Sequence, residues 1–135
     1  MNAEHDAQNR LIAAARDART RAIAPYSNFR VGAVLETAGG RIFTGCNIEN
    51  ASYGLTMCAE RVAIFKALSE GEWRFQKLAI VAETNNPTPP CGACRQIIWE
   101  FCGDITVVLA NESGDTNVWQ MRKLYPHAFD KTFLE

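Results

Sequence analysis

Two short stretches of this chain are apolar at almost every position, and they restrict the fold more than any other feature. They read KLAIVAE at residues 77–83 and ITVVLA at residues 105–110. A strand that buries one face alternates apolar and polar residues, whereas a continuous apolar run is typical of a strand buried on both faces. The sequence therefore predicts a sheet whose buried strands are covered by helices.

One helix and a hairpin are expected before the first of these strands. Residues 4–23 carry apolar side chains at helical spacing, and we expect this amphipathic helix to end before Pro25, since the residue before a proline disfavours the helical region. The stretches 29–37 and 41–49 are rich in β-branched and aromatic residues, and Ala-Gly-Gly separates them. This pattern predicts a β-hairpin.

The second half of the chain supplies further helices. We expect helices at 56–68 and at 92–102, and a partly helical segment at 118–135 that Pro126 interrupts. The resulting order, α-β-β-α-β-α-β, indicates one α/β domain with a mixed sheet, covering residues 1–135.

The charge and the hydropathy pattern argue against two classes of partner. Lys and Arg number 14 against 15 Asp and Glu, and no basic run is present that could follow a nucleic-acid strand. No apolar stretch approaches the ~20 residues that a membrane-spanning helix needs. The first ten residues lack the basic and apolar blocks of a secretory signal, so we expect a cytoplasmic protein with reduced cysteines.

Three of the five cysteines indicate a metal site. Cys91 and Cys94 form a C-x-x-C motif, which alone fits half of a structural zinc site, a redox dithiol or coincidence. A structural zinc module needs a second such pair, and His5 and His127 lie near opposite ends of the chain. Cys58, also at the start of a predicted helix, is the most plausible third ligand. Three thiolates leave one tetrahedral position open, which is typical of a catalytic zinc ion.

The residues after Cys58 fit a catalytic role for this site. Helix N-termini stabilise thiolates, and Arg61 or Arg95 could withdraw further negative charge from the sulfurs. Glu60 lies two residues after Cys58, so its carboxylate can face the open position, take a proton from water and return it to a substrate. Cys-x-Glu followed by Pro-Cys-x-x-Cys is the arrangement of zinc deaminases, in which the Glu is not a ligand.

With these motifs the chain resembles the small zinc-dependent cytidine deaminases of pyrimidine salvage. The matching segments are PYSNFRVGA, GRIFTGCNIENASYGLTMCAER, PCGACRQ and LYPHAF, which spread over residues 25–129. The resemblance implies an α-β-α sandwich with a mixed five-stranded sheet and helices on both faces. It also implies one zinc ion per chain, deamination of cytidine and 2′-deoxycytidine, and a homotetramer whose subunits share active sites.

The resemblance also assigns roles to individual residues. It implies that Glu60 shuttles protons and that Arg61 hydrogen-bonds a ligand thiolate. The implied zinc ligands are Cys58, Cys91 and Cys94. The implied substrate contacts are Phe29 beside the base, the Ala59 N–H at its 2-oxo group, Asn47 and Glu49 at the ribose 3′-hydroxyl, and Tyr53 and Phe129 in a neighbouring subunit's site.

The ribose assignment also has a basis in the residues themselves. Asn47 and Glu49 are two positions apart at the end of a predicted strand, so their side chains are expected to share a face. An amide and a carboxylate can together satisfy a hydroxyl as donor and acceptor. A carboxylate aimed at the sugar would repel phosphate, which favours nucleosides over nucleotides.

Three other hypotheses stay open at this point. A nucleic-acid editing deaminase would use the same zinc chemistry, but it needs a basic strand-binding surface. A non-catalytic zinc-stabilised domain would have no use for Glu60 beside an open position. A deaminase of cytosine-containing antibiotics, or a cytidine deaminase tolerant of N4- or C5-modified substrates, would show the same motifs.

Overall fold

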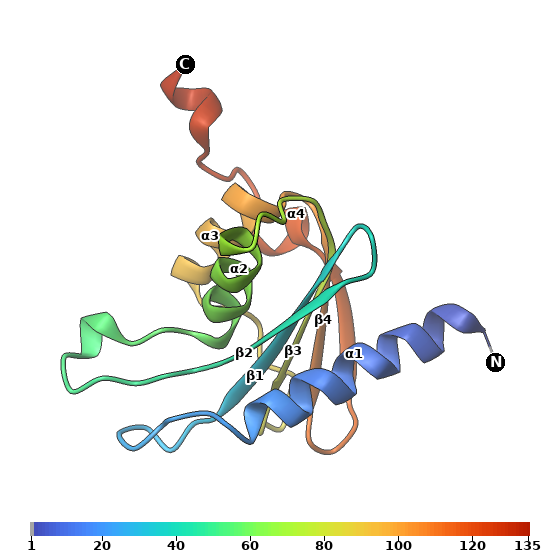
Figure 1. Cartoon of the computed structure of the whole chain (residues 1–135), viewed down its shortest axis with the longest axis vertical. Helices are drawn as coiled ribbons and strands as arrows, with labels where there is room; N and C mark the ends of the chain where they lie inside the picture. Colours follow the sequence, from blue (N-terminus) through green and yellow to red (C-terminus); the bar gives the residue numbers. More distant parts are fainter. Residues whose placement is uncertain (1) are drawn as a thin grey trace.

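The computed structural model describes residues 2–135 and contains one mixed five-stranded sheet in the order β2-β1-β3-β4-β5 (Figure 1). The strands are β1 (Val31–Thr37), β2 (Ile42–Cys46), β3 (Phe75–Ala82), β4 (Thr106–Asn111) and β5 (Thr116–Gln120). The α-helices are α1 (Ala3–Arg19), α2 (Ala59–Ser69), α3 (Gly92–Cys102) and α4 (Met121–Leu124). Two 3₁₀ helices, η1 (Tyr53–Leu55) and η2 (Lys131–Leu134), complete the regular structure.

The central strands β3 and β4 run parallel, and every other neighbouring pair is antiparallel. Ala82 and Asn111 are paired at the carboxyl ends of β3 and β4. Because parallel strands need a crossover connection, the chain between them passes over one face of the sheet as α3. The loop that leaves β3 therefore begins beside the turn that follows β4.

Helices cover both faces of the sheet, as the apolar runs of β3 and β4 predict (Figure 1). On one face, α1 packs its buried side chains Leu11, Ile12 and Ala15 against alternate residues of β1, β3 and β4. On the other face, α2 and α3 share a larger apolar cluster with the opposite side of the same strands. The α-β-α sandwich expected from the sequence is confirmed.

Two glycines allow the helices to approach the sheet closely. A Cβ atom at Gly32 of β1 would lie 1.9 Å from the carbonyl oxygen of Ala15 in α1. A Cβ atom at Gly45 of β2 would lie 2.3 Å from the carbonyl oxygen of Ala59, the first residue of α2. Only a residue without a side chain fits at such a contact. The start of α2 is therefore fixed directly against β2.

The predicted helix over 92–102 has the bounds of α3, but other boundaries were wrong. The helix predicted over 4–23 ends at Arg19, and the one predicted over 56–68 begins at Ala59. Both shifts have the same cause, because the backbone of Ile48 forms isolated β-bridges with Ile23 and Met57. The hairpin strands are correspondingly shorter than 29–37 and 41–49.

Strand β5 is not expected from the sequence. Residues 118–135 are predicted to form a partly helical tail, but the first three of them belong to β5. All five residues of β5 are exposed, so the segment lacks the apolar alternation that identifies a strand. Its strand conformation comes from antiparallel pairing with β4, with Val108 opposite Val118. Only α4 and η2 in that tail are helical. None of the helices in the described range 2–135 is long and apolar enough to cross a membrane.

Candidate active site

The three cysteines singled out in the sequence meet at the N-termini of α2 and α3. Cys58 is the N-cap residue of α2, Cys91 is the N-cap residue of α3, and Cys94 lies in the first turn of α3. Their three Sγ atoms all lie within 4.8 Å of one another. Tetrahedral zinc with Zn–S bonds of ~2.3 Å would place its sulfur ligands about 3.8 Å apart, so this cluster fits a zinc ion with small adjustments.

The surroundings of the cluster stabilise negative charge on sulfur. The Nη2 group of Arg61 donates to Sγ of Cys58 at 3.2 Å, and the backbone N–H of Cys94 donates to Sγ of Cys91 at 3.4 Å. A hydrogen bond from the Cys94 thiol and then the Arg61 guanidinium lower the pKa of Cys58. The pKa of Cys94 is raised, because its thiol proton is held by Cys58 and because it is buried.

The second arginine considered from the sequence, Arg95, does not face the sulfurs. Its Nε donates to the carbonyl oxygen of Pro90 at 2.8 Å, and its Nη1 donates to the carbonyl oxygen of Leu124. Arg95 therefore holds the residue before Cys91 against the last residue of α4. Charge withdrawal from the thiolates is left to Arg61 and to the helix N-termini.

Glu60 lies in the first turn of α2 and is only 5% exposed, although it is a carboxylic acid. Burial raises its pKa to about 7, and the negative charge on Cys58 acts in the same direction. A carboxyl group with a pKa near the working pH can both accept and release a proton, which is the property required of a general acid–base group.

A cavity of about 180 Å³ opens beside the thiol cluster and Glu60. Six predicted site residues line it: the ligands Cys58 and Cys91, the proton shuttle Glu60, and the substrate contacts Phe29, Asn47 and Ala59. Five lining residues were not identified from the sequence: Val31, Thr56, Ile80, Thr88 and Pro89. Ile80 belongs to a buried strand and Thr88 to a proline-rich loop, and no pattern in the sequence distinguishes them from core or loop residues.

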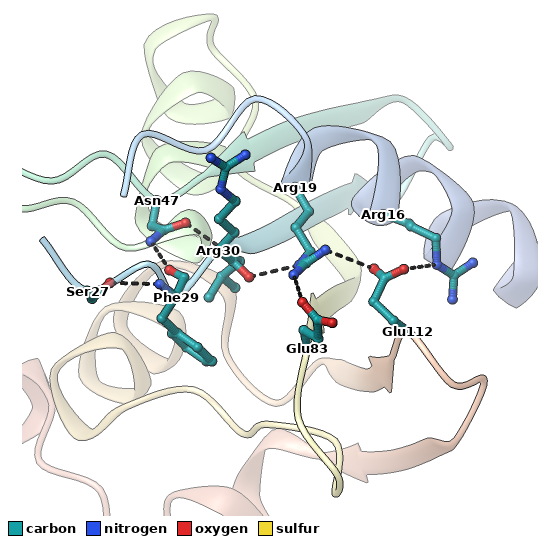
Figure 2. Close-up of polar contacts among 9 residues, drawn as sticks. Arg16, Arg19, Ser27, Phe29, Arg30, Asn47, Glu83 and Glu112 are labelled. Atoms are coloured by element: carbon teal, nitrogen blue, oxygen red, sulfur yellow. Dashed lines mark hydrogen bonds and ion pairs between the residues drawn. The ribbon is translucent and has the colours of Figure 1, made fainter. Parts of the chain in front are cut away.

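The Phe29 side of the cavity is held by a polar network that reaches α1 (Figure 2). Asn47 donates from Nδ2 to the carbonyl oxygen of Phe29 at 2.7 Å and accepts from the N–H of Val31 at 2.8 Å. The residue between them, Arg30, accepts at its carbonyl oxygen from Nε of Arg19 at 2.9 Å. The buried amide of Asn47 thus fixes the backbone that carries Phe29, while still bordering the cavity.

Glu49 borders a second cavity of about 420 Å³, lined also by Tyr26, Ser27, Tyr53 and Thr56. Thr56 lines both cavities, so they adjoin. The carboxylate of Glu49 accepts from the N–H of Tyr26 at 2.9 Å, from the N–H of Ser27 at 3.2 Å and from the Ser27 hydroxyl. These bonds, the hydroxyl first, lower the pKa of Glu49.

Asn47 and Glu49 thus face different, adjoining cavities, and not the single shared face expected from their spacing. Strand β2 ends at Cys46, before either residue, so the two-residue repeat of a strand does not extend over them. Their joint contact with a ribose hydroxyl stays a prediction.

Two predicted substrate contacts lie away from the thiol cluster. Tyr53 is 73% exposed and packs edge-on against Tyr26, with ring centroids 5.7 Å apart. Phe129 is 54% exposed, stacks on Phe133 and lines neither cavity. Its carbonyl oxygen accepts from Nε2 of Gln96 in α3 at 2.9 Å, and the chain after it extends away from the helices as η2 (Figure 1).

Comparison with known proteins identifies close relatives. A family model described as the cytidine and deoxycytidylate deaminase zinc-binding region matches residues 5–110. A cytidine deaminase from Sporosarcina psychrophila is 52% identical over 93% of each chain, and one from Halalkalibacterium halodurans is 52% identical over 88% of this chain and 91% of that protein. The crystal structure of cytidine deaminase from Burkholderia pseudomallei has a TM-score of 0.88 and 52% identity, and the match covers 90% of this chain and 98% of that one.

Proposed function

The chain belongs to the cytidine deaminase family, and we propose that it hydrolyses cytidine and 2′-deoxycytidine to uridine and 2′-deoxyuridine with release of ammonia. One observation carries the proposal: the buried carboxyl of Glu60 borders the same cavity as two thiols of a three-thiol cluster. A proton-transfer group and a metal site with an open position are the two parts that hydrolytic deamination requires.

Cys58, Cys91 and Cys94 would hold one zinc ion per chain. Bound zinc lowers the pKa of water from 15.7 towards ~7 and so supplies a nucleophile at neutral pH. The three thiols suit zinc because thiolate is one of its preferred ligands, and because the cluster leaves the cavity side free. Arg61 holds Cys58 in the thiolate form that a metal ligand needs.

Glu60 carries the proton through the reaction. It accepts a proton from the attacking water and delivers it to N3 of the cytosine ring, which makes C4 more electrophilic. After hydroxide has added to C4, Glu60 takes the proton of the new C4 hydroxyl and delivers it to the departing amine, so that the C4–N bond breaks, ammonia leaves and the C4 carbonyl of uracil forms. Because the pKa of Glu60 lies at about 7, both halves of this cycle are accessible near neutral pH.

The two adjoining cavities suit the two halves of a nucleoside. The cavity beside Glu60, at about 180 Å³, is smaller than the ~300–1,000 Å³ of a typical ligand pocket, so it suits the base alone. Phe29 would pack against the ring. The N–H of Ala59, in the first turn of α2 where amides have no partner within the helix, would donate to the 2-oxo group.

The ribose would occupy the cavity lined by Glu49. Glu49 would accept a hydrogen bond from the 3′-hydroxyl, and Asn47 would reach the sugar from the border of the base cavity. The lining residues of this second cavity include no Lys or Arg. A nucleoside is therefore favoured over its 5′-phosphate, which the Glu49 carboxylate would repel.

The functional unit would be a homotetramer with shared active sites. The aromatic rings of Tyr53 and Phe129 stay largely exposed despite their contacts with Tyr26 and Phe133, and they suit insertion into a neighbouring subunit. Sedimentation velocity of the wild-type protein tests this proposal, which requires a species of four chains.

A single substrate panel tests the proposed function. Cytidine, 2′-deoxycytidine, cytosine, cytidine 5′-monophosphate, N4- and C5-substituted cytidines and a cytosine-containing oligonucleotide would be followed by absorbance and ammonia release. We expect turnover of both nucleosides and weak activity on cytosine, the monophosphate and the oligonucleotide. Turnover of the oligonucleotide above that of cytidine would instead identify a nucleic-acid editing enzyme.

A further inference from the structure

The loop between β3 and α3 is the cavity wall with the least backbone support. Residues 83–91 supply Thr88, Pro89 and Cys91 to the cavity lining. Prolines at 87, 89 and 90 have no N–H to donate. Within the described residues, no backbone amide of 83–90 donates to another backbone group. Side chains from outside the loop must therefore hold it in place.

Asn111, at the carboxyl end of β4, supplies most of the side-chain contacts that hold the loop. It is completely buried, and its Nδ2 donates to the carbonyl oxygens of Thr84 at 3.0 Å and Asn85 at 2.9 Å. Its Oδ1 accepts from the N–H of Asp115 at 2.9 Å, and its Nδ2 also lies 3.1 Å from Oδ2 of Asp115. One amide thus joins the start of the loop to the β4–β5 turn.

The connection continues from Thr84 to the cavity. The Thr84 hydroxyl donates to the carbonyl oxygen of Asn86 within the loop. Its oxygen lies 2.8 Å from the hydroxyl of Thr88. Because Thr84 has a single hydroxyl proton and uses it on Asn86, Thr88 is the donor in this second bond. Thr88 lines the cavity beside Glu60, so Asn111 and the cavity wall are two hydrogen-bonded links apart.

The far end of the loop is held independently. Nε of Arg95 donates to the carbonyl oxygen of Pro90 at 2.8 Å, directly before the predicted ligand Cys91. Arg19 of α1 pairs with the exposed side chain of Glu83 at the start of the loop. Asn111 anchors the part from Thr84 to Thr88, and Arg95 anchors the part that carries the thiol. Loss of the Asn111 contacts would disturb the base-binding wall while leaving the thiol cluster in place.

We propose that Asn111, acting through Thr84, is a positioning residue for cytidine: it holds Thr88 and Pro89 against the base. Asn111 lines neither the cavity beside Glu60 nor the one beside Glu49. It acts on the reaction only by fixing the loop. The substrate class rests on the proposed function, whereas the anchoring of the loop does not.

The test separates the loop contacts of Asn111 from its contacts with the turn. The exchange variant Asn111→Asp with Asp115→Asn retains an amide–carboxylate pair in the turn but removes both donors to the Thr84 and Asn85 carbonyls. Asp115→Ala is the matched control, because it weakens the turn and leaves both loop bonds intact. Thr84→Val removes the bonds of the Thr84 hydroxyl to Asn86 and Thr88, leaves both Asn111 bonds to the loop intact and conserves the volume of the side chain.

We expect KM for cytidine to rise about tenfold in the exchange variant, which loses both bonds from Asn111 to the loop. We expect a rise of roughly 2- to 10-fold in Thr84→Val, because only one of the two bonds of the Thr84 hydroxyl reaches the cavity wall. Zinc content should be unchanged in both variants. KM is the informative quantity, because a loss of folded enzyme alone would lower the maximal rate and leave KM unaltered. Asp115→Ala should keep KM within about twofold of wild type, a change below the loss of one such bond.

NMR relaxation of the backbone amides in the wild-type and variant proteins tests the anchor without any substrate. The order parameters of residues 84–86 and 88 should be lower in the exchange variant and in Thr84→Val than in wild type, and unchanged in Asp115→Ala. An unaltered KM in Thr84→Val together with unaltered order parameters in the loop would overturn the proposal, even if the exchange variant does not fold. If wild-type protein were inactive on cytidine but the order parameters of the loop responded as expected, the substrate assignment would fail and the anchor would stand.

Discussion

The Nη2 group of Arg61 lies 3.2 Å from Sγ of Cys58, one helical turn away on α2. A thiolate needs such a donor, because three thiolates around a divalent metal leave the cluster with one negative charge. The Nε atom of the same guanidinium is buried and has no hydrogen-bond partner among the described residues. The structure therefore keeps a cation beside the thiol cluster at some energetic cost, which indicates that its charge is needed there.

Arg61→Gln should lower kcat/KM for cytidine while retaining zinc. Hydrogen bonds to charged groups are worth ~1.5–3 kcal/mol, so a roughly 10- to 150-fold loss is expected. Steady-state kinetics together with metal analysis measure both quantities. Arg122→Gln is the control, since the Arg122 side chain is exposed and pairs, among residues 2–135, with Asp104 alone, at 3.9 Å. Equal kcat/KM in the two variants would show that Arg61 does not tune the thiolates.

Cys91→Ala should lose both the metal and the activity, because two thiols cannot complete the proposed set of three protein ligands. Cys46→Ala is the matched control: Cys46 is a free cysteine of β2 outside the cluster, and its loss should leave the zinc content at about one per chain. Elemental analysis of the purified proteins makes the comparison. An active, metal-free Cys91→Ala protein would be incompatible with the mechanism.

The raised pKa of Glu60 has a consequence for the stability of the zinc-depleted protein. The folded state holds the Glu60 proton with a pKa of about 7, against 4.5 in an unperturbed glutamate. The resulting stabilisation is complete below the unfolded pKa and is lost as the pH rises through the folded one. Glu60→Gln does not titrate, so it should gain roughly 3 kcal/mol on wild type between about pH 4 and about pH 8.

Urea unfolding of chelator-treated wild type and Glu60→Gln at several pH values measures this difference. Taking the difference between the two proteins removes the titration of groups that do not interact with Glu60. A difference in the free energy of unfolding that does not change with pH would mean that the pKa of Glu60 is the same in the folded and the unfolded protein.

Glu49→Gln should reduce kcat/KM for cytidine roughly 10- to 150-fold through a weakened bond to the 3′-hydroxyl. Wild-type enzyme should show a similar loss with 3′-deoxycytidine. The variant should lose little more with this analogue, because both changes remove the same interaction. Losses that simply multiply would show that Glu49 is not the partner of the hydroxyl.

Much of the fold follows from local patterns, and the parts that do not have identifiable causes. The apolar runs of β3 and β4 and the helical spacing of α3 arise from the burial of residues that are close together in the sequence. These patterns can therefore be recognised in the sequence alone. Strand β5 forms because it pairs with β4. The start of α2 and the end of α1 are set by backbone bridges to Ile48. Such long-range pairing leaves no periodic signal in the segment concerned.

The residues of the candidate site also fall into those that could be predicted from the sequence and those that could not. The thiol cluster and Glu60 were predictable, because their chemistry demands particular residue types at short spacing on helix N-termini. Thr88 and Asn111 were not, since a threonine in a loop and an asparagine after a strand are common in any chain. Their roles arise from contacts between residues 27 positions apart, such as Asn111 with Thr84, which only the folded chain brings together.

The most direct test of the central claim is the turnover of cytidine by zinc-loaded Glu60→Gln. Glutamine fills the same space and hydrogen-bonds, but it cannot carry a proton, so zinc content and fold should match wild type. We expect kcat to fall by ~10²–10⁴-fold, the usual contribution of a general acid–base group, or by more because Glu60 serves several steps. A zinc-loaded Glu60→Gln protein that retained a tenth of wild-type turnover would contradict the account, because another group would then have to move the proton.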